Sequence, residues 1–312
     1  MNRSLVCGIL VTIFMRMPLM ADVEVKHSIA VQGSKLSEPA TEGTLDKAFI
    51  RGEMKLAAKS EKGVSGLLHL RLQTDVNETE VIEPQVRQAF FTVPIPYVSS
   101  QIGRWYEKYT PGDYFGGYLF DVKPAGSGSF KTNYSVVDGF RVSVPVIEKM
   151  QTTVHAAITP QTFSFDETYA MLRISSQPIK QLEMNVGTNL NVISENDDRV
   201  HRFSATAQYQ IVKGLLLFVE YGIVDLSDAS DNSWFLSGFD IPTGGILDLL
   251  RAEIEYKQDR TEEYESDIAW MILLAKKVFG TSMDIGCGAD PRRLGSEEAS
   301  DVGAFMRITT KF

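Results

Sequence analysis

The sequence predicts an all-β chain that forms a transmembrane antiparallel up-and-down β-barrel of about sixteen strands, with 12 to 14 strands as the alternatives. The last stretch, VGAFMRITTKF at residues 302–312, alternates between an apolar and a largely polar face and ends on the aromatic Phe312. Similar alternating segments recur along the chain, and the connections between them alternate between short and long. A soluble β-sandwich is the alternative fold, but it predicts no such regular alternation of connections.

The clearest hairpin of the sequence lies at residues 50–73. In its first half, Arg51, Glu53 and Lys55 alternate with apolar side chains, and after a turn at 60–63 the pattern resumes with Arg71 on the polar face. Charged residues at every second position suit neither lipid nor a dry core, because an ionised side chain is costly to bury without a partner. They therefore belong in water, either outside a soluble sheet or inside a channel.

The other strands follow in order along the chain. They are expected at 23–31, 86–93, 97–105, 134–144, 152–159, 168–176, 179–192, 200–211, 215–224, 234–241, 246–257, 267–276, 280–289 and 302–312. The pair at 86–93 and 97–105 alternates poorly. Short turns separate strands at 60–63, 94–96, 145–150, 177–178, 212–213, 242–245 and 276–279, and longer polar connections lie between these turns. Short periplasmic turns and long outer loops are typical of a transmembrane barrel, and an even strand number places both termini in the periplasm.

Composition limits the classes of function. With 312 residues and 44% hydrophobic content, the chain is expected to form one large domain. The 31 basic and 40 acidic residues give a net charge of -9 without a basic patch, which argues against nucleic acid as a partner. A mean hydropathy of -0.08 is low for a helical membrane protein.

The first 21 residues predict a signal peptide. Arg3 supplies the positive charge, residues 5–15 the apolar segment, and cleavage after Ala21 would leave Asp22 first. A buried helix is the alternative. The barrel domain is then 22–312, in which Cys287 is the single cysteine, so no internal disulfide is expected.

Catalysis has little support in the sequence, so we expect no enzyme. The 4 histidines show no metal-ligand spacing, and neither a nucleophile elbow nor a phosphate-binding loop is found. No catalytic residue, metal or cofactor is therefore predicted. A barrel enzyme and a structural or adhesive barrel remain as alternatives, because the fold alone does not decide function.

The terminal strand resembles that of the porins, the β-barrel channels of the Gram-negative outer membrane. The resemblance implies that Phe312 is an assembly signal read by the barrel-assembly machinery. It also implies a location in the cell outer membrane, in contact with outer-membrane lipid and lipopolysaccharide, and a homo-oligomer, commonly a trimer. The expected function is passive diffusion of small hydrophilic solutes or ions. A substrate-specific channel is an alternative.

The water-facing positions of the strands lean basic, which favours anions weakly. The candidate pore-lining residues are Arg51, Lys55, Arg71, Arg141, Arg173, Arg202, Arg251, Glu53, Glu220 and Glu253. The longest connection, at about 106–133, is the third outer loop, which in the general porins folds into the barrel and narrows the channel. Its candidate constriction residues are Glu107, Asp113, Tyr114, Phe115, Tyr118 and Asp121. The alternative is that the loop aromatics cap the barrel from outside.

Overall fold

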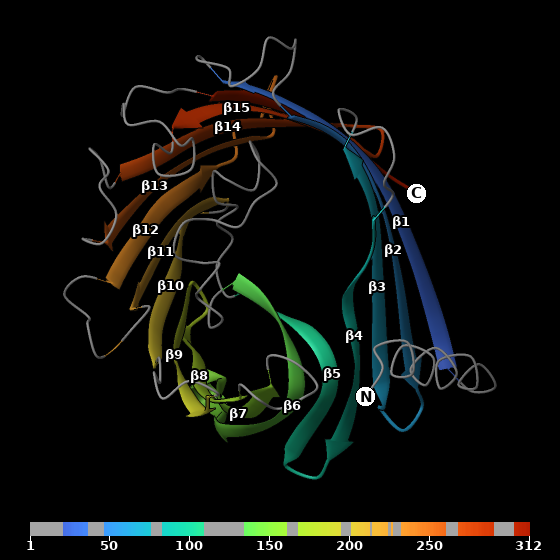
Figure 1. Ribbon diagram of the computed structural model, residues 1–312, viewed down its shortest axis with the longest axis vertical. Coiled ribbons are helices and arrows are strands. Elements are labelled where there is room, and N and C mark those ends of the chain that lie inside the picture. The colour runs from blue at the N-terminus through green and yellow to red at the C-terminus, as the bar shows by residue number, and fades with distance from the viewer. Residues whose placement is uncertain are drawn as a thin grey trace.

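The strands form one closed antiparallel barrel in which each strand pairs with its neighbours in sequence and β1 pairs with β16. The computed structural model describes residues 21–36, 47–75, 83–108, 134–160, 168–194, 201–212, 214–223, 226, 232–259, 268–289 and 303–312. Figure 1 shows the barrel end on, with the strands curving around an interior space. The predicted barrel of sixteen strands is confirmed.

The sixteen strands alternate with connections of very different length. They are β1 (Ala21–Leu36), β2 (Lys47–Ser60), β3 (Ser65–Asp75), β4 (Glu83–Ile95), β5 (Val98–Lys108), β6 (Tyr134–Ile147), β7 (Thr152–Pro160), β8 (Thr168–Ile179), β9 (Leu182–Ile193), β10 (Arg202–Val212), β11 (Leu215–Ile223), β12 (Asn232–Ile241), β13 (Leu249–Asp259), β14 (Ile268–Val278), β15 (Thr281–Ala289) and β16 (Gly303–Lys311). A single 3-10 turn, η1 (Glu148–Met150), joins β6 to β7 within the described part of the chain. Among the described residues, no helix has the length and apolar character needed to cross a membrane.

The terminal strand closes the barrel. Its register with β1 runs from Ser28 opposite Lys311 to Leu36 opposite Gly303. At the end of this ladder, the backbone N–H of Phe312 donates to the carbonyl oxygen of His27 at 3.0 Å. The alternating stretch at the carboxyl end therefore becomes the seam of the barrel.

The two faces of the wall differ in chemistry, as the alternation predicted. On β9, Val186 is 42% exposed on the outer face, whereas its neighbour Asn185 is buried on the inner face. The same contrast separates Leu172 from Arg173 on β8 and Ile254 from Glu253 on β13. Because successive side chains of a strand point to opposite faces, the facing of one residue determines that of every other residue in a regular strand.

The poor alternation of residues 86–105 has a structural cause. In the pairing of β3 with β4, Leu70 lies opposite Val86 and His69 opposite Gln88, so Arg87 is an extra residue in β4. Such a bulge reverses the faces of all residues that follow it. In β5, Gly103 has a φ of +125°, and a Cβ there would lie 2.1 Å from the carbonyl oxygen of Ala89, so no other residue fits this contact.

Several strand ends differ from the sequence-based prediction; strand β8, for example, continues through Ile179, so the turn after it lies at 180–181 rather than at 177–178. Two other differences concern the third outer connection and the turn before β13. Strand β5 continues through Lys108, so the third outer connection spans 109–133 rather than starting at 106. Strand β13 begins at Leu249 instead of residue 246, because the segment before it forms a turn. In this turn the Thr243 hydroxyl donates to the Leu247 carbonyl oxygen at 2.7 Å, and Ile246 projects from the tip.

The inner face also carries apolar clusters, which the alternation pattern did not predict. One cluster comprises Met271, Leu273, Ala275 and Phe305, with Leu249 packed against it. A second comprises Trp105, Val137, Ala157 and Met171. Met271 lies opposite Glu253 in the register of β13 and β14, which places the first cluster beside charged residues of the inner wall. The interior wall is therefore a mixture of ionised and apolar patches.

Candidate functional site

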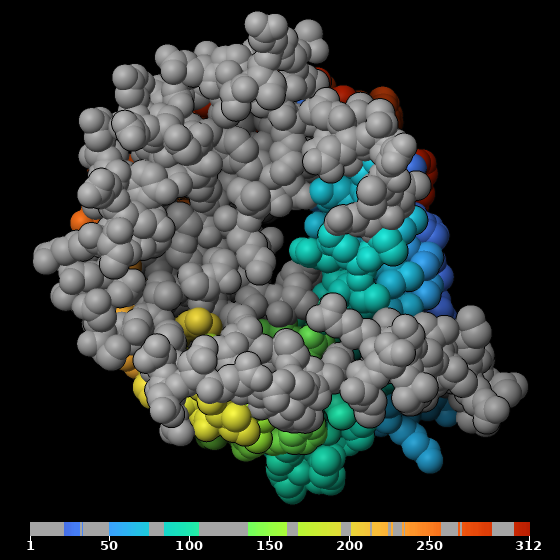
Figure 2. Space-filling model, in the orientation of Figure 1, coloured from blue at the N-terminus to red at the C-terminus, as the bar shows by residue number. Residues whose placement is uncertain are grey.

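The inner wall of the barrel is the candidate site, and all the predicted pore-lining residues lie on it. Arg51, Arg173, Arg202, Arg251, Glu220 and Glu253 are buried, Glu53, Arg71 and Arg141 are partly buried, and Lys55 is exposed. The end-on space-filling view shows a central hollow that residues of β3 and β4 border on one side (Figure 2). Charged side chains from many strands thus surround one interior space.

A hydrogen-bonded group on β2 and β3 neutralises part of the basic wall. The Arg71 guanidinium donates to Glu53 Oε1 from Nε at 2.8 Å and from Nη2 at 2.7 Å. His69 Nε2 lies 3.3 Å from Glu53 Oε2, and Arg51 Nε donates to Gln73 Oε1 at 2.9 Å. Glu53 therefore compensates the charge of Arg71, while Arg51 has a neutral acceptor.

Two further arginines lie in ion pairs on strands beyond the seam, one on β12 and β13 and one on β15 and β16. Arg251 on β13 donates to Asp240 on β12 from Nε at 2.6 Å and from Nη2 at 2.7 Å, and its Nη1 lies 3.8 Å from Glu253. Arg307 on β16 donates to Asp284 on β15 from Nη2 at 2.7 Å. The pair of Arg251 with Asp240 is bidentate, with one nitrogen on each carboxylate oxygen, and such pairs are among the strongest and most directional contacts that arginine makes. Asp240 was missed in the sequence analysis because only the register of β12 and β13 places it opposite Arg251.

A basic arc extends over β6 to β10. It contains Arg141 on β6, His155 on β7, Arg173 on β8 and Arg202 on β10. The Arg141 guanidinium lies 5.2 Å from the centre of the Trp105 ring, and the Arg202 guanidinium lies 5.1 Å from that of Tyr169. Stacking on an aromatic face holds a guanidinium in place without cancelling its charge. The three arginines make this part of the wall basic, and Glu183 on the inner face of β9 offsets part of their charge.

An acidic arc adjoins the basic one on β11 to β13. Glu220 and Glu255 both lie in register with Leu236 of β12, one on each side, and Glu253 follows on β13. All three carboxylates are buried. Charges of opposite sign on neighbouring parts of one wall create a transverse field, which acts on ions and dipolar solutes in the interior.

One ion pair lies on the outer face, where the sequence pattern predicts apolar residues. Arg104 donates to Asp138 from Nε at 2.8 Å and from Nη2 at 2.7 Å. The two residues share their face with Ile102 and Phe140, which are 58% and 47% exposed. The pair was missed because the two residues lie 34 positions apart, and only the pairing of β5 with β6 brings them together.

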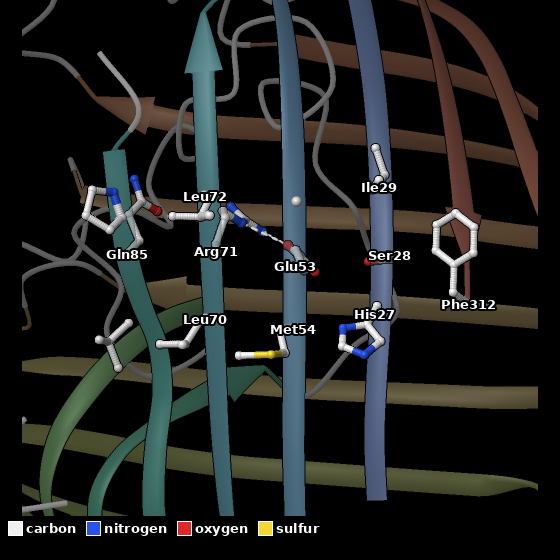
Figure 3. Close-up of a pocket in the computed structure, with 13 residues that line it drawn as sticks. His27, Ser28, Ile29, Glu53, Met54, Leu70, Arg71, Leu72, Gln85 and Phe312 are labelled. Carbon is white, nitrogen blue, oxygen red and sulfur yellow. Dashed lines mark hydrogen bonds and ion pairs between the residues drawn. The ribbon is translucent and has the colours of Figure 1, made fainter. Parts of the chain in front are cut away.

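A groove of about 450 Å³ also lies at the outer face of β1 to β4, at the seam with Phe312. Gly52 leaves an open notch there, because nothing lies within 4 Å of the position that a Cβ would occupy. The close-up shows Leu72, Met54 and Ile29 around this notch, while the ion pair of Glu53 with Arg71 connects the neighbouring strands (Figure 3). The groove is chiefly apolar and belongs to the outer surface rather than to the interior.

The predicted constriction residues are not placed. The backbone of Glu107 belongs to β5, and its side chain lies outside the described part of the structure. Asp113, Tyr114, Phe115, Tyr118 and Asp121 lie outside the described residues, as do residues 1–20 of the predicted signal peptide.

The closed barrel of sixteen antiparallel strands, with ionised residues inside and apolar residues outside, has the fold of the bacterial porins. The structure of a mutant of Rh. blastica porin superposes with a TM-score of 0.63 over 93% of this chain and 100% of that chain, at 10% identity. The high-pH structure of Pseudomonas putida OprB superposes with a TM-score of 0.68 over 96% of both chains, also at 10% identity. No protein-family model matches the sequence, and no curated protein matches it. The predicted porin fold is confirmed by these structures.

Proposed function

We propose that this protein is an outer-membrane porin through which small hydrophilic solutes and ions diffuse passively. The observation that carries the proposal is the division of the barrel wall into an apolar outer face and an inner face lined by ionised residues. A wall of this kind suits a hydrocarbon environment outside and water inside. Passive diffusion needs no chemical step, so the relevant properties of the wall are its width and its charge.

Conductance tests this function. Purified barrel added to a planar lipid bilayer is expected to produce stepwise current increases in KCl. A barrel that is heat-modifiable on a gel, and hence folded, but inserts without any conductance would contradict the proposal and favour a structural or adhesive barrel.

A weak preference for anions is the second part of the proposal. Arg71, Arg251 and Arg307 have carboxylate partners, whereas Arg141 and Arg202 in the basic arc stack on aromatic rings, so we choose Arg141 and Arg202 as the test positions for the positive charge of the wall. Local charge, rather than the net charge of the protein, sets the potential that an ion meets. Replacing Arg141 and Arg202 with Gln is expected to move the reversal potential in a KCl gradient toward cation preference. Ala205→Val on the outer face of β10, away from the proposed oligomer interface, is the control and is expected to leave the reversal potential unchanged.

We further propose that the chain forms a homo-oligomer through the outer face of β1 to β6. The resemblance to porins supports this, as do the groove at Gly52 and the ion pair of Arg104 with Asp138. Ionised groups at a membrane-facing surface are better accommodated against protein than against hydrocarbon. Filling the notch by Gly52→Trp is expected to shift the protein from oligomer to monomer in native mass spectrometry. A wild-type protein that is monomeric in mild detergent would contradict the proposal.

The location of the protein follows from the same proposal. We expect a mature chain that starts at Asp22 and fractionates with the outer membrane, with Phe312 read by the assembly machinery. Amino-terminal sequencing of membrane fractions tests the cleavage site. An intact amino terminus at Met1 would show that residues 1–21 are not a signal peptide.

A further inference from the structure

Three glycines on the inner face lie directly opposite a large side chain of the adjacent strand. The pairs are Gly187 with Arg173, Gly238 with Phe218, and Gly286 with Phe305. The three large side chains are buried. A glycine within a strand often marks a place where another group approaches the backbone closely. Each large side chain therefore lies along the wall instead of projecting toward the barrel axis.

The contact at Gly187 involves the charged end of Arg173. A Cβ at position 187 would lie 3.0 Å from Cζ, 3.2 Å from Nη2 and 3.3 Å from Nε of Arg173. The guanidinium thus lies flat over the backbone of β9. Arg173 is 0% exposed, so its charge does not reach the surface of the interior space. Residue 187 consequently controls where this charge lies.

Gly187 differs from the other two glycines in what a side chain would meet. At Gly238 a Cβ would lie 2.7 Å from the carbonyl oxygen of Ala252, and at Gly286 it would lie 2.5 Å from that of Ile272. Substitution at those two positions therefore distorts the sheet. At Gly187 the three nearest atoms all belong to the flexible end of Arg173, so a substitution displaces that side chain and leaves the backbone in place.

We propose that Gly187 is a positioning residue for ion selectivity, which keeps the charge of Arg173 against the wall and away from permeating ions. The inference rests on the proposed channel function. Because the backbone of β9 lies behind the guanidinium, a side chain at position 187 moves the charge toward the barrel axis. There it comes closer to passing ions, and Coulomb interaction strengthens as distance falls. The positive potential that the basic arc presents to a passing ion in the wild type is thus lower than the number of its arginines indicates.

The side chains around Arg173 and Gly187 are mostly uncharged. His155 lies opposite Arg173 on the β7 side, and Ser204 lies opposite Gly187 on the β10 side. Asn185 and Asn189 flank Gly187 on the inner face of β9 and carry no charge. The residues on either side of Gly187 on this face are therefore neutral, and the carboxylate of β9, Glu183, lies farther along the strand beyond Asn185.

The test is the reversal potential and conductance of Gly187→Ala and Gly187→Val in a KCl gradient. Both variants are expected to shift the reversal potential toward anion preference and to lower the conductance, with the larger effect for Val. Ala205→Val, which adds volume on the outer face of the adjacent strand, is the matched control and is expected to match the wild type. In the double variant Gly187→Val with Arg173→Gln, the shift is expected to disappear, because the displaced charge is absent.

A second readout does not depend on conductance. An arginine-specific dicarbonyl reagent, followed by peptide mass spectrometry, is expected to leave Arg173 unmodified in the wild type and to modify it in Gly187→Val. Arg71, which is partly exposed, should react in both proteins and serves as the internal control.

The outcomes separate the two proposals. If the folded wild type does not conduct but the labelling changes as expected, the proposed channel function is wrong, and the inference that Gly187 sets the position of the Arg173 guanidinium stands. If the wild type conducts and neither Gly187 variant changes selectivity, or if the shift persists without Arg173, the inference about Gly187 is wrong. Heat modifiability on a gel confirms that each variant is folded, and Gly187→Ala keeps the test available if the Val variant misfolds.

Discussion

Removal of Asp240 gives the most direct test of the energetics of the inner wall. The side chains of Arg251 and Asp240 are only 8% and 13% exposed, and two hydrogen bonds of 2.6 and 2.7 Å join them. Removing one partner of a buried ion pair typically costs about 3 to 5 kcal/mol, because the remaining charge loses its compensation. Arg251 keeps Glu253 at 3.8 Å, so we expect a loss near the lower limit, about 3 kcal/mol, for Asp240→Ala.

The measurement is the free energy of unfolding in urea, followed by tryptophan fluorescence in detergent micelles. Replacing both partners, Asp240→Leu together with Arg251→Met, is expected to recover most of the loss, because an apolar pair leaves no buried charge without a partner. A single variant within about 0.5 kcal/mol of the wild type would show that the pair is solvated like a surface salt bridge. A double variant as unstable as the single one would show that packing, rather than charge, explains the loss.

Three other predictions concern the outer face, a turn and the seam. Val186→Arg should lower stability by about 2 to 4 kcal/mol in the same urea experiment, whereas Val186→Leu should have little effect, since only the first brings charge to the lipid-facing surface. Asp248 accepts the backbone N–H of Lys277 at 2.5 Å, and this hydrogen bond holds the pKa of the Asp248 carboxyl below its usual value. The stability that the ionised Asp248 contributes is complete above the unfolded-state pKa of about 3.9 and is lost as the pH falls through the lower folded-state pKa. Asp248→Asn should therefore make the temperature of thermal unfolding less sensitive to acid. An unchanged pH profile would contradict this. Deleting Phe312 should reduce the heat-modifiable fraction in cell membranes, because the backbone pairing with His27 at the seam is lost, and equal assembly of the truncated chain would contradict this.

Much of the fold could be predicted from local sequence pattern. The alternation of Arg51, Glu53 and Lys55 with apolar neighbours indicates both a strand and the face that meets water, because side chains along a strand alternate with a period of two. The repeated sequence of long and short connections then predicts the number of strands and their antiparallel order. These features depend on residues close together in the chain, which is why they can be read without coordinates.

The pairing of distant residues could not be predicted in this way. Arg87 is a bulge that reverses the faces of the residues following it in β4, and nothing in its local sequence indicates the extra residue. The same holds for Arg104 and Asp138 on the outer face, which the alternation pattern did not identify. A slip of one residue would move every side chain of a strand to the other face, so such positions depend on the register of the closed barrel.

The sequence by itself therefore determined the class of fold, the strand order and the chemistry of the two faces. Only the tertiary structure decided which charges are compensated, as in the pairing of Asp240 with Arg251, and which are withdrawn from the interior, as Arg173 is over Gly187. The physical reason is that alternation is a property of one strand, whereas charge compensation depends on the distance between side chains on different strands. That distance is set by register and barrel closure, which involve the whole chain at once.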